Sequence, residues 1–140
     1  MTIRVFYVSS AVGPQTTYVT ESILRWSQDY NSKNGITGFL CQGQGVFLQV
    51  LEGERHEVVS LYTRIFADKR HKNVEMIHFE NIVHRRYERW SMAHVNLSEI
   101  DPMMAINWAE FDPYSVNGRQ VMAQIDQLIS AGNVIGLPAQ

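Results

Sequence analysis

The opening segment of the chain has the composition and alternation of a β-strand. Residues Ile3–Ser9 are mostly apolar, and the period of two along a strand places Val5, Tyr7 and Ser9 on one face. The pair Gly13–Pro14 follows and predicts a turn. We therefore expect the chain to begin with a strand whose two faces carry different side chains.

Two later stretches carry apolar residues at the three- and four-residue spacing of amphipathic helices. The first begins at Thr16 or Thr17, either of which can cap a helix, and ends near Lys33, where Asn34–Gly35 follows. The second runs from about Arg55 to Ala67. Their apolar stripes are Val19, Ile23, Trp26 and Tyr30 in the first, and Val58, Leu61, Tyr62, Ile65 and Phe66 in the second.

Four further apolar runs predict four more strands, and a tight hairpin loop joins the first two of these runs. The order strand, helix, two strands, helix, strand, followed by a fifth strand, is the α+β ferredoxin-like pattern. In this pattern the two helices cover one face of the sheet. The four runs are Ile36–Cys41, Gly45–Gly53, Val74–Val83 and Trp90–Leu97.

The character of the sequence changes after Asp101–Pro102. Residues Met103–Trp108 suggest a short helix and Arg119–Ala131 suggest another, but this tail is too short to form a domain. We therefore expect one domain over residues 1–97 and a helical extension over residues 98–140 that packs on the open face of the sheet.

Composition and charge narrow the class of protein. The chain has 140 residues, 45% hydrophobic and 19% charged, as is usual for one soluble globular domain. A net charge of −2 gives no electrostatic reason to expect nucleic acid or an anionic membrane as a partner. Cys41 is the only cysteine, which excludes an internal disulfide. With neither a signal peptide nor an apolar run long enough to span a bilayer, we expect a cytoplasmic protein.

One polar residue interrupts the apolar run Gly45–Gly53. Gln49 stands in its middle, on the same face as Phe47 and Leu51. A buried primary amide must find partners for two donors and one acceptor, or stability is lost. Because an amide can also turn over and exchange its donor and acceptor ends, a buried Gln49 that faces a cofactor would be a switch.

Four other positions each allow a structural and a functional interpretation. Tyr7 is either a core tyrosine or a phenol placed to donate an electron or a proton. Asn31 lies on one helical stripe with Ile23, and asparagine near a helix end usually caps it or is solvated. Arg64 is expected in a surface ion pair. The cluster Asp68–Lys72 at the end of the second helix is usually solvated and less often holds a phosphate.

Together these residues resemble the BLUF domain, a flavin-binding sensor of blue light, over about Thr2–Asn96. The fold of that family is ferredoxin-like, which agrees with the pattern of strands and helices. The motifs that carry the resemblance are Tyr7, Asn31-x-x-x-Gly35-Ile36-Thr37-Gly38, Gly45-Val46-Phe47-Leu48-Gln49-x-Leu51-Glu52-Gly53, Asp68-x-Arg70-His71 and Trp90-Ser91-Met92.

The resemblance implies a place for a flavin ring between the two helices, on the sheet. Ile23 would pack against one face of the ring. Asn31 would hydrogen-bond its pyrimidine edge, and Arg64 the carbonyl at that edge or the ribityl chain. Gln49 would face flavin N5 and the C4 carbonyl, and it would bridge to the hydroxyl of Tyr7.

The remaining matched residues fall at the two ends of this site. Asp68, Arg70 and His71 are expected to bind the cofactor, with Arg70 and His71 near the phosphate end. Trp90 and Met92 match the strand positions that pass the light-induced change outward, and the sequence does not decide which of the two faces the flavin.

The resemblance implies a light-driven switch and not an enzyme. Blue light excites the oxidised flavin, Tyr7 gives up an electron and a proton, and Gln49 rotates or tautomerises, which shifts the absorption to the red. FAD is the expected cofactor, with FMN as the alternative. Without an output catalytic domain of its own, the chain would signal to a separate downstream protein or through the assembly of a homo-oligomer.

Two other functions compete with this one. A small ferredoxin-like enzyme, such as a cofactor-free monooxygenase, would explain the fold but not the joint spacing of Tyr7, Asn31 and Gln49. A partner-binding module that has lost its flavin would not need all three residues. A colourless purified protein would favour the enzyme, and the flavin content after denaturation separates these cases.

Overall fold

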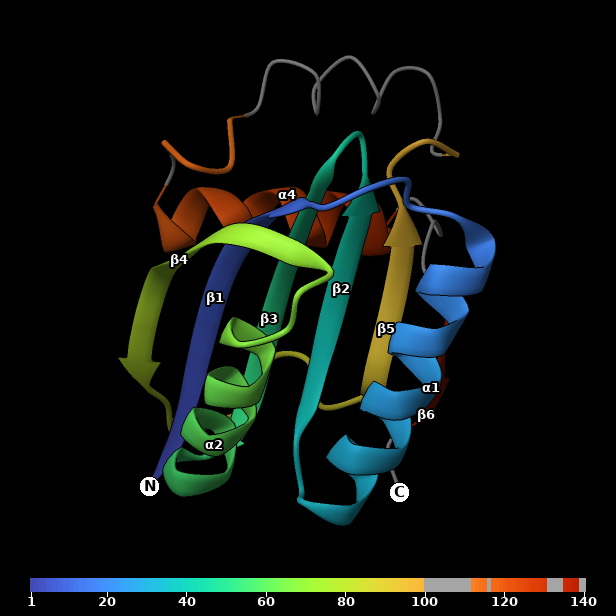
Figure 1. Ribbon diagram of the computed structural model, residues 1–140. Coiled ribbons are helices and arrows are strands. Elements are labelled where there is room, and N and C mark those ends of the chain that lie inside the picture. The colour runs from blue at the N-terminus through green and yellow to red at the C-terminus, as the bar shows by residue number, and fades with distance from the viewer. Residues whose placement is uncertain (100–111, 116, 131–134, 139–140) are drawn as a thin grey trace.

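One mixed sheet forms the centre of the protein in the computed structural model, which describes residues 1–99, 112–115, 117–130 and 135–138 (Figure 1). Its six strands are β1 (Thr2–Ala11), β2 (Thr37–Gly43), β3 (Val46–Glu54), β4 (His71–Asn81), β5 (Trp90–Asn96) and β6 (Ile135–Pro138). They stand in the order β4-β1-β3-β2-β5-β6. Only β2 and β5 are parallel neighbours, and the other four pairs are antiparallel.

Helices α1 (Thr17–Lys33) and α2 (Arg55–Phe66) connect strands that are not neighbours in the sheet. α1 joins β1 to β2 with β3 between them, and α2 joins β3 to β4 with β1 between them. The Thr16 hydroxyl caps α1 by accepting from the backbone N–H of Val19 at 3.2 Å. This arrangement confirms the predicted α+β ferredoxin-like fold.

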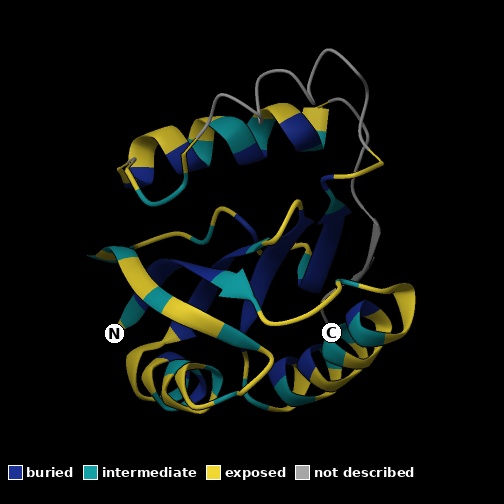
Figure 2. Ribbon diagram, turned by 45° about the horizontal axis from the view of Figure 1, so that its top comes forward, coloured by how far each residue is buried: buried dark blue, intermediate teal, exposed yellow. Residues whose placement is uncertain are grey.

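Among the described residues, the C-terminal part of the chain adds a helix and a strand. Helix α4 (Gly118–Ser130), which matches the helix predicted over Arg119–Ala131, covers the sheet face opposite α1 and α2 (Figure 2). The short helix predicted over Met103–Trp108 lies outside the described residues. Strand β6 was not predicted, because four residues that include a glycine and a proline carry no local strand signal. It forms by pairing with the edge of β5. No helix among the described residues is long and apolar enough to cross a membrane.

Two hydrophobic cores lie on the two faces of the sheet. On β1, Phe6 and Val8 face the core under α4, and Val5 and Tyr7 face the core under α1 and α2. This is the alternation that the sequence predicts. Cys41 is fully buried in the α4 core, and burial raises the pKa of its thiol well above the ordinary value. Each sheet face therefore has its own packing partner, and Tyr7 belongs to the face that α1 and α2 cover.

A buried charged network ties the strands to the β4–β5 connection. Glu52 of β3 is fully buried and accepts from Arg4 Nε at 2.8 Å and from the backbone N–H groups of Arg86 and Tyr87 at 3.0 and 2.6 Å. Arg4 also pairs with Glu80, and Arg86 pairs with Asp126 of α4. The carboxylate of Glu52 therefore fixes two successive backbone groups of the connection that leads into β5.

Candidate functional site

A cavity of about 460 Å³ lies between α1 and α2, above the sheet. Its volume lies within the roughly 300–1,000 Å³ usual for small-molecule pockets. Strands β1, β2 and β3 supply its floor and the two helices its walls. The lining residues are Tyr7, Ile23, Trp26, Ser27, Leu40, Phe47, Gln49, Arg64, Ile65, Ala67, Asp68, Arg70 and His71.

Tyr7 and Gln49 form a hydrogen-bonded pair on the floor of this cavity. They stand directly opposite each other in the β1–β3 ladder, and the Tyr7 hydroxyl donates to Gln49 Oε1. Burial, with smaller contributions from Tyr62 and Asp68, raises the pKa of Tyr7 above its ordinary value. Tyr7 is therefore a neutral phenol and a hydrogen-bond donor at physiological pH.

The other end of the Gln49 amide has a much weaker partner. Gln49 Nε2 lies 3.4 Å from Met92 Sδ, and a thioether sulfur is a weak acceptor. If the amide turned over, Nε2 would face the Tyr7 hydroxyl and Oε1 would face the sulfur. In the orientation that the structure shows, the amide therefore makes one strong contact through Oε1 and one weak contact through Nε2.

The structure places Met92 and Trp90 on opposite faces of the sheet. Met92 is fully buried in the core under α1 and α2, whereas Trp90 packs on the α4 core with its ring centroid 6.1 Å from that of Phe39. The pairing of β5 with β6 shifts register between these two residues, so their side chains do not follow the usual alternation. Met92 is therefore the one of the two that contacts Gln49.

Asn31 is fully buried between α1 and β5 and does not line the main cavity. Its Nδ2 donates to the carbonyl oxygen of Ser91 at 2.8 Å, and Gln28 Nε2 donates to the carbonyl oxygen of Met92 at 3.4 Å. Asn31 Oδ1 has no hydrogen-bond partner among the described residues. Asn31 therefore lies outside the lining of the cavity, and its predicted hydrogen bond to the polar edge of a flavin stays a prediction.

Ile23 of α1 and Arg64 of α2 lie on opposite walls of the cavity, and their contacts with a flavin stay predictions. The Arg64 guanidinium stands over the Tyr30 ring, with its Cζ 5.5 Å from the ring centroid. The Tyr30 ring in turn stacks on that of Trp26 at 5.0 Å. The sequence placed Tyr30 and Trp26 in the apolar stripe of the first helix and predicted a surface ion pair for Arg64. The three side chains instead bridge the two helices beside the cavity.

The cluster after α2 closes one end of the cavity. Asp68 and Arg70 form an ion pair at 2.6 Å, and the hydrogen bond from Arg70 holds the pKa of Asp68 below its usual range. His71 Nδ1 lies 2.7 Å from Ser9 Oγ, and its Nε2 contacts the carbonyl oxygen of Ile65. Both ring nitrogens of His71 are thus engaged by the protein. His71 shapes the cavity wall, and its predicted place near a phosphate stays a prediction.

Comparison with known proteins identifies the family. The BLUF family model, described as sensors of blue light using FAD, matches residues 2–93. The chain belongs to the BLUF family. Over 87 residues, 61% of the chain, this BLUF domain is 36% identical to the photoactivated adenylate cyclase subunit beta of Euglena gracilis. The match covers only 10% of that relative's length.

Two solved structures resemble the chain over most of its length. The photo-activated state of BlsA is 28% identical with a TM-score of 0.79, and the match covers 92% of this chain and 95% of BlsA. The dark state of BlrB, a BLUF protein, is 27% identical with a TM-score of 0.79, and the match covers 94% and 96% of the two chains. The chain is thus a blue-light sensor that uses a flavin, and the comparisons give no support to a cofactor-free monooxygenase.

Proposed function

We propose that this BLUF domain binds the ring system of FAD in the cavity between α1 and α2 and converts blue light into a reversal of the Gln49 amide. The observation that carries the proposal is the hydrogen bond from the Tyr7 hydroxyl to Gln49 Oε1 on the cavity floor. The opposite end of the same amide contacts only the sulfur of Met92 among the described residues.

The residues present fit a flavin. The cavity has the volume and the apolar walls for a flat ring, and Ile23 would pack against that ring. The Arg64 guanidinium lines the cavity and suits a carbonyl or the ribityl chain. Asn31 lies one helical turn beyond Ser27 of the lining, and its unpartnered Oδ1 would accept from an N–H at the polar edge of the ring. Gln49 would face the reactive centre of the ring. Arg70 would lie toward the phosphates.

When bound, the flavin supplies blue-light absorption and an excited state that accepts an electron. Tyr7 would be the donor: its ring would give one electron to that excited state, and its hydroxyl proton would move along the existing hydrogen bond to Gln49 Oε1. The protonated amide would then turn and return a proton from its nitrogen end to the Tyr7 oxygen as the electron returns to the Tyr7 ring, which leaves Gln49 as the imidic tautomer with its two ends exchanged. The protein would thereby hold two hydrogen-bond arrangements that light interconverts.

The altered hydrogen bonding of Gln49 would be transmitted out of the site through β5. Met92 contacts Gln49 through its sulfur, while Asn31 and Gln28 of α1 hold the backbone on either side of that contact. The exchange of the two ends of Gln49 puts oxygen in place of nitrogen beside Met92 and disfavours its present position. We infer that the displaced strand signals to a separate protein or alters the assembly of a homo-oligomer, and that the chain itself catalyses no reaction.

The test is the visible absorption spectrum of the purified protein before and after blue light. We expect a flavin spectrum that shifts reversibly to the red, and loss of that shift in Tyr7→Phe and in Gln49→Leu. Tyr62→Phe is the matched control, because the Tyr62 ring stands edge-on to Tyr7 at 5.7 Å and makes no hydrogen bond to Gln49. That variant should keep the shift.

Two results would contradict the proposal. One is a protein that takes up no flavin after reconstitution. The other is a red shift that persists in both Tyr7→Phe and Gln49→Leu. Flavin content after denaturation must be measured for each variant, so that a lost shift is not mistaken for lost cofactor.

A further inference from the structure

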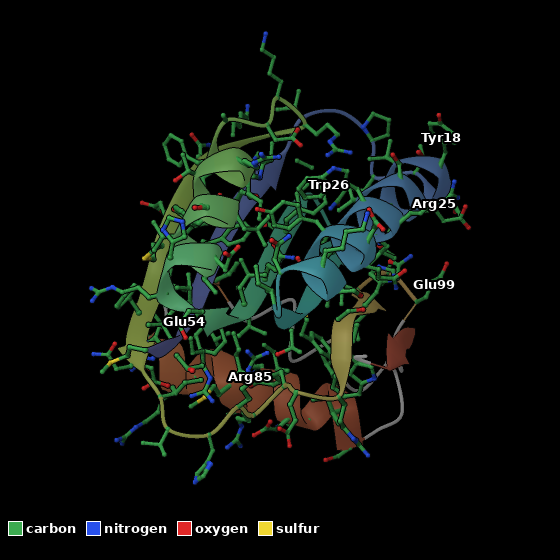
Figure 3. The ribbon with its side chains drawn as sticks, turned by 90° about the horizontal axis from the view of Figure 1, so that it is seen from below. Tyr18, Arg25, Trp26, Glu54, Arg85 and Glu99 are labelled. Atoms are coloured by element: carbon green, nitrogen blue, oxygen red, sulfur yellow. The ribbon has the colours of Figure 1, made fainter. Side chains whose placement is uncertain are left out.

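The solvent-facing surface of α1 carries two large aromatic side chains that the two cores do not use. Tyr18 is 83% exposed and Trp26 is 45% exposed. A groove of about 480 Å³ runs along this surface, and both rings line it. In Figure 3, Tyr18 and Arg25 lie on the side of α1 turned away from α2, and Trp26 lies on the side toward α2. Aromatic residues left exposed together on one helix are typical of a protein–protein interface.

Four charged residues of alternating sign form a row along the same surface. Glu21, Arg25, Asp29 and Lys33 follow one another at intervals of four residues, and all four are exposed. This spacing makes them neighbours on one face of the helix. Among the described residues, the only ion pair of this charged row joins Asp29 to Lys33 at 3.1 Å, and these side chains are 68% and 72% exposed. A pair this exposed contributes little stability, so all four charges are available to a partner.

The charged row is complementary to itself when a second copy of α1 runs antiparallel to the first. With the two-fold axis at the level of Ser27, Glu21 faces Lys33 of the partner subunit, and Arg25 faces Asp29 of the partner subunit. Each pair occurs twice by symmetry. Moving the axis to the level of Arg25 or of Asp29 opposes like charges, and a parallel arrangement would place every charge against its own copy. The order of charges therefore favours one orientation and one register.

We propose that α1 is the interface of a homodimer, in which two copies of the chain pack antiparallel through the charged row. The rings of Tyr18 and Trp26 flank this row and would supply apolar contact area. The helix has 17 residues and is about 25 Å long, so the contact is smaller than a standard interface, and we expect weak association that depends on concentration. The inference deepens the proposed function, which includes the assembly of a homo-oligomer, but the pairing of two helices requires no bound flavin.

Sedimentation velocity of the full chain, with and without FAD, tests the interface over a series of protein concentrations. We expect a reversible equilibrium between monomer and dimer in both forms. Arg25→Glu places a carboxylate opposite Asp29 of the partner subunit, and Asp29→Arg places a guanidinium opposite Arg25 of the partner subunit. Because each substitution acts twice across the two-fold axis, each should weaken dimerisation by about tenfold or more.

Mixing the two variants gives the sharpest measurement. In a mixed dimer, the new carboxylate at position 25 of one chain faces the new guanidinium at position 29 of the other, and the native Asp29 faces the native Arg25. All charges of the row are then complementary again, as in the unaltered dimer. Equimolar mixing should therefore restore dimerisation to about its original strength, a result that damage to the fold of either variant cannot produce.

Arg119→Glu is the matched control, because it makes the same change of charge at an exposed arginine of α4, on the opposite face of the sheet. It should leave dimerisation unchanged. A monomer at every concentration would overturn the inference, and so would a dimer that resists both substitutions on α1 or one that mixing does not restore. These outcomes leave the light-induced red shift untouched. Loss of that shift in a chain that still dimerises would instead contradict the proposed function alone.

Discussion

Two glutamates contact the same arginine, and they differ in burial in a way that makes their replacement informative. Glu52 is fully buried, while the side chain of Glu80 is 35% exposed, and both pair with Arg4. Burial opposes ionisation of Glu80, but hydrogen bonds from Arg4 and His78 bring its pKa below the ordinary value. The carboxylate of Glu80 is therefore charged near neutral pH, and replacing either glutamate by glutamine removes one of the two ion-pair partners of Arg4.

The expected costs of the two replacements are very different. In Glu52→Gln an amide NH₂ must replace a carboxylate oxygen, although the oxygens of Glu52 accept from Arg4, Arg86 N and Tyr87 N. Breaking a buried ion pair in this way costs about 3–5 kcal/mol. Glu80→Gln alters a partly solvated pair, for which about 1 kcal/mol or less is expected. The predicted difference in lost stability follows from the burial of the two glutamates, since both pair with the same arginine.

Urea unfolding followed by circular dichroism measures both values. With a denaturant dependence of about 1–3 kcal/mol/M, Glu52→Gln should lower the unfolding midpoint by about 1–5 M and Glu80→Gln by less than about 1 M. The reasoning would be refuted if Glu52→Gln stayed within 1 kcal/mol of the unaltered protein, or if the two variants lost equal stability. The Tyr7–Gln49 pair is on the opposite sheet face, so any remaining folded Glu52→Gln protein should still bind flavin.

Three further outcomes can be checked directly. Gly38→Ala should lower the thermal midpoint by several degrees, because a Cβ there would stand 2.3 Å from the carbonyl oxygen of Val50 in the central sheet. Met92→Ala should cost about 2–5 kcal/mol in denaturant unfolding, whereas Met76→Ala, at an exposed methionine, should cost far less. The pKa of Tyr7 is raised in the folded state, so above about pH 10 the unfolded chain loses the phenolic proton before the folded chain does. The free energy of unfolding should therefore fall as the pH rises above about 10, and denaturant unfolding at a series of pH values will test this.

Local periodicity was sufficient to predict which side chains share a sheet face, whereas the contact between Tyr7 and Gln49 was predicted only from the resemblance to the BLUF domain. Tyr7 and Gln49 each stand in an apolar strand, and alternation alone assigns both to the same face as their apolar neighbours. Their direct pairing then follows from the antiparallel ladder of β1 and β3. The two helices were predicted in the same way, because their apolar stripes and caps lie within the segments themselves.

Features that depend on contacts between distant segments could not be predicted. A register shift against β6 places Trp90 and Met92 on opposite faces of the sheet, and β6 itself forms only by pairing with β5. Arg64 stands over Tyr30 because α1 and α2 pack side by side, and no local pattern encodes that contact.

The isolation of Cys41 has a practical consequence for experiments on this protein. It is the only cysteine in the sequence, it is fully buried, and its raised pKa keeps it a thiol at neutral pH. Thiolates, not thiols, react with maleimide reagents. A single cysteine introduced at an exposed position such as Val83 can therefore be labelled selectively with a spin label or a fluorophore, and the native Cys41 need not be replaced.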